Sequence, residues 1–419
     1  MGPYQSGIGA YVVFCRVRGR DVFNIAPGVI LFSAAVVLAL NMGVRQTFGL
    51  FTEPVTLEFG MSRGNFALSI AIQNLLWGLL TPFFGAIADR HGTGRVLVVG
   101  ALIYVVGLMI MALGDSAGAF YLGSGLLIGI AVSACGFPIV LAAVARSTPP
   151  EKRALALGLS SAGGSAGQFV LLPSSQIMIQ QLGWQNTLIV LAALCLLIIP
   201  LATALKGRPA QSPGSSLSFG QALAEAGRHR GFQLANVGFF VCGFHVAFIA
   251  THLPAYIVSC NLPAMVGATA LGVVGFFNII GGVMAGVLGQ RFQRKNLLTL
   301  IYLARALVIA AFMLGPKTEI AVWLFSAAFG LLWLSTVPLT SGLVGVLFGP
   351  RYMATLVGIV MLSHQIGAFF GAWLGGLSWD LTSSYDSVWI ISVLLGLLAA
   401  ACNWPIKEEP APLATREAT

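Results

Sequence analysis

Long runs of apolar residues, separated by short polar stretches, dominate this chain of 419 residues. Each run is roughly 20 residues or longer, which is the length that a helix needs to cross the hydrocarbon core of a bilayer. The pattern predicts an all-α membrane protein with twelve transmembrane helices. The predicted spans are residues 26–51, 64–88, 95–114, 118–145, 153–180, 184–205, 232–259, 263–290, 296–315, 318–347, 352–378 and 386–406.

Composition agrees with this interpretation. Charged residues are 8% of the chain, whereas a soluble domain carries about 25%, and the mean hydropathy is +0.90. Small residues let helices approach closely in lipid, so the many glycines fit as well. We expect the glycine pairs spaced four residues apart to pack helices within one chain, which favours a monomer. These pairs are Gly125/Gly129, Gly163/Gly167, Gly282/Gly286 and Gly371/Gly375.

The placement of Lys and Arg predicts the topology. Arg63 and Lys317 are the basic residues expected on one side of the membrane, and all other loop cations fall on the side of the two termini. Positive loops stay in the cytoplasm, so we expect a multi-pass protein of the cytoplasmic membrane with both termini inside. The formal net charge of +9 is then a topology signal, and we expect no nucleic-acid partner.

The second half of the chain repeats the first at an offset of 200 residues. The repeat predicts two pseudo-symmetric six-helix bundles, residues 26–205 and 232–406. The polar segment 206–231 begins as a linker, and residues 1–25 and 407–419 are expected to be cytoplasmic. The matched pairs include Gly43/Gly243, Phe48/Phe248, Pro54/Pro254, Pro138/Pro338, Gly158/Gly358 and Gly167/Gly367. Internal duplication is typical of secondary transporters, whose binding site lies where the repeats meet.

The loop after the second predicted span resembles the signature loop of the major facilitator superfamily. It reads G-A-I-A-D-R-H-G-T-G-R, and the residues that carry the resemblance are Gly85, Asp89, Arg90, Gly92 and Arg95. The resemblance implies a conformational latch, in which the Asp89 carboxylate pairs with nearby arginines in one transport state. The basic pair that usually follows the second glycine is replaced by Thr93 and Gly94, and Gln290 replaces the acid in the second half.

A second stretch of the sequence resembles one particular branch of this superfamily. Residues 145–168, followed by Gly183 and Trp184, are similar to the region of spans 4 and 5 in the monocarboxylate carriers and oxalate:formate exchangers. These proteins carry small organic anions, and many hold a basic residue in the outer part of span 1, where Arg45 stands. The arginine often found in their span 8 is absent, since Phe277 and Asn278 occupy the middle of that span.

Two arginines, Arg45 and Arg305, lie inside predicted spans, whereas all thirteen acidic residues lie in loops or at span ends. A buried guanidinium without a carboxylate partner favours a bound anion, and its planar fork matches a carboxylate. Arg45 could instead extend outward to Glu53 or Glu58. For Arg305, a structural role bonded to main-chain carbonyls is the alternative.

Neutral polar residues and histidines within the spans complete the predicted substrate site: His245, His252, His364, Asn74, Gln168, Asn278 and Gln365. His245 falls opposite Arg45 in the repeat. Each could equally be a hydrogen-bonded residue at a helix contact. Because histidine titrates near neutral pH, proton coupling is a hypothesis that these residues motivate.

Taken together, the sequence predicts a secondary transporter of a small organic anion, working by alternating access with proton coupling or exchange. An efflux pump for amphiphilic compounds is the first alternative, favoured by Phe239, Phe240, Phe244, Phe276 and Phe277. A transport-inactive sensor is the second, and it usually brings a large soluble extension. We expect no enzyme activity, since the spans hold no nucleophile or carboxylate pair. We also expect no metal or cofactor, because the six cysteines form no C-x-x-C pair.

Overall fold

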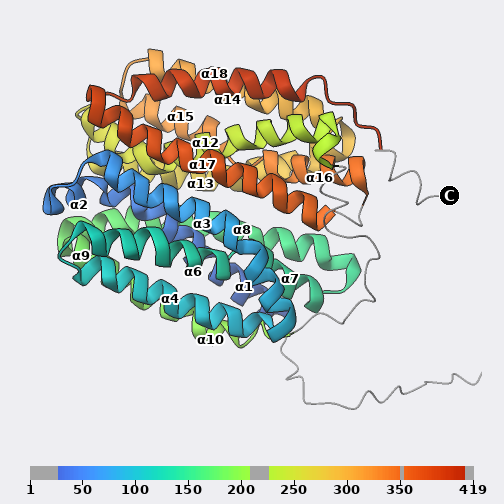
Figure 1. The fold of residues 1–419 in the computed structure, drawn as a ribbon, viewed down its shortest axis with the longest axis horizontal. Coiled ribbons are helices and arrows are strands. Elements are labelled where there is room, and N and C mark those ends of the chain that lie inside the picture. Colours follow the sequence, from blue (N-terminus) through green and yellow to red (C-terminus); the bar gives the residue numbers. More distant parts are fainter. Residues whose placement is uncertain (1–26, 208–225, 350–352, 411–419) are drawn as a thin grey trace, which may run out of the picture.

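The computed structural model describes residues 27–207, 226–349 and 353–410, and these are folded into helices without strands (Figure 1). Twelve helical rods are long and apolar enough to cross a membrane, which confirms the predicted fold class. Predicted segment 1–25, most of the linker 206–231 and residues 411–419 of the tail lie outside the described residues.

The first half contains six rods. They are α1 (Pro27–Gln46) continued by η1 (Thr47–Phe51) and α2 (Thr52–Phe59), then α3 (Arg63–His91), α4 (Thr93–Leu113), α5 (Ala117–Phe120) with η2 (Tyr121–Leu127), α6 (Ile128–Ala134) and α7 (Phe137–Ser147), α8 (Pro150–Leu182), and α9 (Trp184–Leu196) with α10 (Ile198–Ala202). The first rod is longer than its predicted span, which ends at residue 51. The helical conformation continues past residue 51 because Pro54 falls in the first turn of α2, where a missing N–H is tolerated.

The second half repeats this order. Its rods are α12 (Arg230–Ser259), α13 (Ala264–Arg291), α14 (Arg294–Leu314), α15 (Glu319–Leu332) with α16 (Thr336–Phe348), α17 (Met353–Thr382) and α18 (Asp386–Asn403). In Figure 1 the first half, blue to green, lies below the second half, yellow to red. We call the end of the bundle where α1 begins and α18 ends the terminal face, at the right of the figure. The end that holds α2 is the opposite face.

Equivalent rods of the two halves break at equivalent places. The fourth rod breaks between α6 and α7, and the tenth breaks between α15 and α16, although each is predicted as one continuous span. Pro138 and Pro338, a matched pair of the repeat, follow these breaks in the first turns of α7 and α16. Proline lacks the N–H that would continue the preceding helix, so it fixes where the second segment starts.

The repeated glycines mark the closest helix contacts. At Gly167 a Cβ would collide with the carbonyl oxygen of Ala39, so α8 touches the backbone of α1. At Gly367, the matched residue, a Cβ would collide with the carbonyl oxygen of Phe240, so α17 touches α12 in the same way. Three of the four predicted glycine pairs lie at such contacts, and the exception, Gly282/Gly286, has nothing within 4 Å.

The two halves meet along α3 with α17 and along α8 with α13. Hydrogen bonds between the halves are found at the opposite face and down to the middle of the bundle. They join Arg63 Nη1 to Tyr385 Oη (3.1 Å), Gly64 N to Asp380 Oδ2 (2.9 Å), Gln168 Nε2 to Leu271 O (3.0 Å) and Asn278 Nδ2 to Ser165 Oγ (2.8 Å). Among the described residues, no hydrogen bond joins the two halves nearer the terminal face. This conformation is therefore closed at the opposite face.

We predict that Gly167→Val destabilises the protein, because a branched side chain would push α8 away from α1. Overpacking of this kind costs about 1–3 kcal/mol. The matched control is Gly158→Val on the same helix, since a Cβ at Gly158 meets nothing within 4 Å. Thermal unfolding of the purified protein in detergent should show a lower midpoint for Gly167→Val alone. Equal midpoints for both variants would contradict this account of the helix contact.

Candidate functional site

Arg45 lies deep inside the bundle. It is 18 residues after Pro27, so it stands about 27 Å along the first rod at 1.5 Å per residue. Its side chain is only 9% exposed. The guanidinium donates from Nη2 to Oδ1 of Asn74, and its Cζ lies 4.6 Å from the ring centroid of Trp77, both on α3. A charge is thus held near mid-depth between two neutral side chains.

The partners of Arg45 fix its position without neutralising it. Asn74 is itself oriented, since its Nδ2 donates to Ile70 O at 2.8 Å, and Trp77 contributes a cation–π contact through the face of its ring. The Nε of Arg45 has no hydrogen-bond partner, and no carboxylate in the described part of the chain pairs with the guanidinium. Glu53 and Glu58, the alternative partners, are exposed and form no ion pair with it.

Trp77 is a site residue that the sequence analysis missed. Its spacing of three from Asn74 places both on one face of α3, which is a signal that could have identified it. Tryptophans are common in membrane spans, however, and spacing alone cannot show which of them faces an arginine on another helix.

The amide side chains of Gln168 and Asn278 lie at the contact between the halves. Gln168 on α8 donates to a carbonyl of α13. Asn278 on α13 donates to Ser165 on α8, and its Oδ1 accepts a hydrogen bond from Leu334 N at 3.0 Å. Gln365 on α17 is 1% exposed and packs against Gly78 of α3, and its Oε1 has no partner. Each of these three side chains therefore lies where one half touches the other.

The histidines face other helices of the second half. His245 is fully buried, and its Nε2 donates to Ser392 O of α18 at 2.8 Å. The Nε2 of His252 donates to Ala372 O of α17 at 2.6 Å. The ring of His364 packs 5.0 Å from that of Phe239. The repeat gives Arg45 and His245 the same depth, but Arg45 faces α3 whereas His245 faces α18, so the structure does not bring them together.

Arg305 on α14 is bonded to the break between α15 and α16. Its Nε donates to Leu332 O at 3.1 Å and its Nη2 donates to Trp333 O at 2.5 Å. These carbonyls have no continuing helical turn to bond to, and they carry the partial negative charge of a helix C-terminus. Asn278 accepts from the freed amide of Leu334 on the other side of the break. This geometry corresponds to the structural alternative for Arg305.

The predicted latch residues lie on the terminal face. Asp89, Arg90 and Arg95 are exposed, and Asp89 forms no ion pair with a described residue. Gly85 has nothing within 4 Å of a built Cβ. Gly92 adopts a φ of 97°, which favours glycine at the turn between α3 and α4.

Three hydrogen-bond or ion-pair contacts lie near these residues and at the equivalent loop of the second half. Thr93, which stands where the family has a basic residue, accepts a hydrogen bond from Arg146 Nη2 on α7. In the second half, Arg294 Nη1 pairs with Glu408 Oε2 at 3.6 Å, and Glu408 Oε1 also accepts from Lys295 N at 2.6 Å. All of these contacts lie within one half, so none joins the two halves at the terminal face.

These features define a class: a polytopic all-α protein of two repeated halves that buries arginine side chains without carboxylate partners among the described residues. The sequence profile of the Major Facilitator Superfamily matches residues 31–372. The chain belongs to this superfamily, as the resemblance of the signature loop predicted.

The chain is similar over most of its length to several members. It is 24% identical over 385 residues to the uncharacterized MFS-type transporter YcxA of Bacillus subtilis (strain 168), covering 89% of this chain and 93% of that protein. It is 24% identical over 377 residues to Monocarboxylate transporter 13 of Rattus norvegicus, covering 87% of this chain and 85% of that protein.

Solved structures share the fold. A bacterial homolog of the human lysosomal transporter Spinster, in an inward-facing and occupied conformation, superposes with a TM-score of 0.74 at 15% identity, covering 95% of this chain and 98% of that one. The nucleoside transporter NupG gives 0.76 at 13% identity, covering 90% and 99%. At such identities the likeness concerns the fold alone.

We predict that Arg305→Gln destabilises the folded protein by about 2 kcal/mol, because charge-assisted hydrogen bonds to the carbonyls at the helix break are lost. The control is Arg95→Gln, which removes an exposed charge from the terminal face. Thermal unfolding in detergent distinguishes the two. An Arg305→Gln protein as stable as the Arg95→Gln protein would contradict the structural role.

Proposed function

We propose that this protein is a secondary transporter of small organic anions, and that the anion binds to Arg45. The observation that carries the proposal is the guanidinium held near mid-depth by Asn74 and Trp77 with no carboxylate to neutralise it. Leaving a charge unpaired in a low-dielectric interior is costly, so a site of this kind favours an anionic ligand.

A monocarboxylate fits the chemistry of the site. The unpartnered Nε and the remaining edge of the Arg45 guanidinium offer N–H donors in a plane, which suits the two oxygens of a carboxylate. Trp77 covers the face of the guanidinium and so directs a ligand to its edge. Relatives named as monocarboxylate transporters support this substrate class.

Transport is proposed to follow alternating access between the two six-helix halves. We place the terminal face in the cytoplasm of a cell bounded by a cytoplasmic membrane, because the loop cations gather on that face. In that orientation both termini are cytoplasmic, and the structure closed at the opposite face is an inward-facing state. The glycine pairs packed within the chain favour a monomeric carrier.

Proton coupling is the proposed energy source, with anion exchange as the alternative. Moving a monoanion into a cell against an inside-negative potential costs about 2.3 kcal/mol per 100 mV, and a proton carried with it removes this cost. His245, His252 and His364 remain the proposed proton acceptors, although two of them already donate to carbonyls.

The first experiment measures uptake of labelled lactate, pyruvate, formate, oxalate and an aromatic acid by reconstituted vesicles. We expect saturable uptake of one of these acids, reduced at least about 100-fold by Arg45→Gln, because loss of a charge-assisted pair is worth about 3 kcal/mol. Arg228→Gln, which removes an exposed arginine outside the predicted latch and substrate site, serves as the control. If no acid is carried by a folded protein, or if Arg45→Gln carries it normally, the efflux pump for amphiphilic compounds becomes the better hypothesis.

The second experiment imposes a pH gradient on the same vesicles. If protons move with the anion, uptake should rise when the side from which the acid enters is the more acidic. His245→Ala should reduce this dependence while leaving exchange of internal for external acid intact. Uptake that ignores both the gradient and the substitution would exclude coupling through His245 and leave exchange or uniport.

A further inference from the structure

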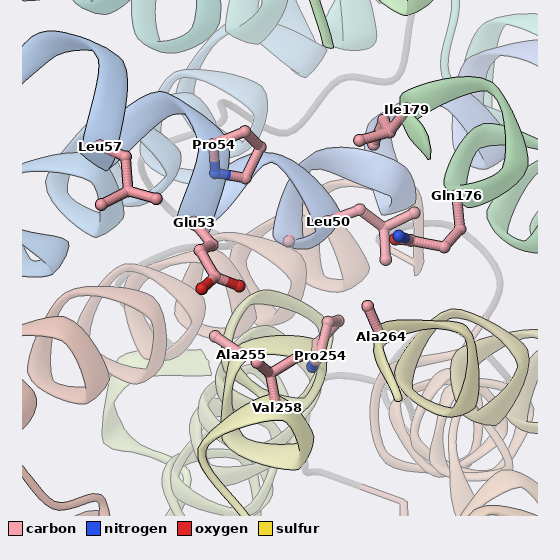
Figure 2. Close-up of a pocket in the computed structure, with 11 residues that line it drawn as sticks. Leu50, Glu53, Pro54, Leu57, Gln176, Ile179, Pro254, Ala255, Val258 and Ala264 are labelled. Carbon is pink, nitrogen blue, oxygen red and sulfur yellow. The ribbon is translucent and has the colours of Figure 1, made fainter. Parts of the chain in front are cut away.

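A cavity opens at the opposite face, away from Arg45. It has a volume of about 260 Å³ and lies between η1 and α2 of the first half and the end of α12 in the second half (Figure 2). Residues from α8 and the start of α13 complete its wall. The matched prolines of the repeat, Pro54 and Pro254, both line it, so equivalent segments of the two halves contribute to its wall.

The chemistry of this cavity differs from that around Arg45. Apolar side chains, among them Leu50, Ile179 and Val258, form most of its wall. Glu53 is its one charged and one titratable lining residue, and Figure 2 shows its carboxylate directed across the cavity toward Pro254 and Ala255. Glu53 pairs with no cation in the described part of the chain. The cavity thus presents a negative charge beside an apolar surface.

Gln176 gives a second polar group. Its side chain is only 6% exposed, and it lines the cavity from α8. Gln176 forms no side-chain hydrogen bond with any residue that the structure describes, whereas Gln168, two turns earlier on α8, is bonded across to α13. The Gln176 amide therefore keeps hydrogen-bonding capacity at the cavity wall, where a ligand or water can satisfy it. The amide oxygen can accept from the same ligand that pairs with Glu53.

We propose that this cavity is a binding site for a small organic ammonium ion with an apolar body. The ammonium group pairs with the Glu53 carboxylate and donates to the Gln176 amide, while the apolar body packs against Leu50, Ile179 and Val258. The cavity is slightly smaller than those that hold drug-sized ligands, which limits the ligand to the size of a phenylalkylamine. The proposal is independent of what the Arg45 site carries.

Binding at this site favours the closed opposite face. The wall of the cavity comes from both halves, and it exists because η1 touches α12: a Cβ at Gly49 would lie 2.5 Å from Ala250 O. Separation of the halves at this face would divide the lining residues. A ligand with affinity for the closed arrangement alone shifts the population toward it, so the ammonium ion acts as an inhibitor of the transport cycle.

The test uses the full chain in lipid nanodiscs and phenethylammonium as the probe, with uncharged 2-phenylethanol for comparison. Isothermal titration should give saturable binding of phenethylammonium to wild type. Glu53→Gln should weaken it at least about tenfold, because a charge-assisted hydrogen bond is lost. Glu58→Gln removes an exposed carboxylate that does not line the cavity, and it should bind as wild type does. The uncharged alcohol should also bind at least about tenfold more weakly.

A space-filling variant and a structural readout complete the experiment. Ala264→Phe, at the first residue of α13, should block the cavity and abolish binding. Hydrogen–deuterium exchange over residues 47–60 and 250–264 should slow when phenethylammonium is added to wild type, and not in Glu53→Gln. Absence of saturable binding, equal binding by Glu53→Gln, or unchanged exchange would overturn the proposal. Because no step depends on uptake, failure here is distinguishable from failure of the Arg45 proposal.

Discussion

The central constraint in this molecule is a positive charge that the protein positions but does not neutralise. Arg45 donates to the amide of Asn74 and stacks over Trp77, both on the neighbouring helix α3. Neutral partners lower the cost of burial by hydrogen bonding and by cation–π attraction, yet they leave the full charge in place. Arg305 shows the contrasting solution, because its guanidinium is bonded to carbonyls at the end of α15. Each guanidinium keeps one nitrogen without a hydrogen-bond partner, Nε in Arg45 and Nη1 in Arg305, but Arg305 is held by main-chain carbonyls whereas Arg45 is held by side chains alone.

The surrounding architecture makes such a site possible. Gly167 and Gly367 let α8 and α17 touch the backbones of α1 and α12, so each half packs tightly around its first helix. Breaks in the fourth and tenth rods interrupt the hydrogen bonding of their helices, and Asn278 links one of these breaks to Ser165 in the other half. The halves contact each other along α3 with α17 and along α8 with α13, and these are the contacts that alternating access would have to rearrange.

Much of the fold could be predicted from the sequence because the bilayer restricts what a chain can do. Twelve long apolar runs leave little choice but twelve helices, and the repeated Pro138 and Pro338 identify equivalent positions in the halves. The candidate binding site was harder to predict from the sequence. The alignment of the two repeats predicts the depth of His245 in the bundle, but not the face of the helix on which it lies. The structure shows that this histidine contacts α18. Trp77 carries no charge or motif, so only the three-dimensional structure shows the contact of its ring with Arg45.

The most direct measurement compares the binding of a transported acid with that of its primary amide, which has nearly the same shape but no charge. If Arg45 holds the anion, purified wild type should bind the acid about 100-fold more tightly than the amide, a difference of about 3 kcal/mol. The preference should disappear in Arg45→Gln while the weak affinity for the amide persists. Equal binding of acid and amide by wild type, or a preference that survives in Arg45→Gln, would contradict the assignment of Arg45 as the anion site.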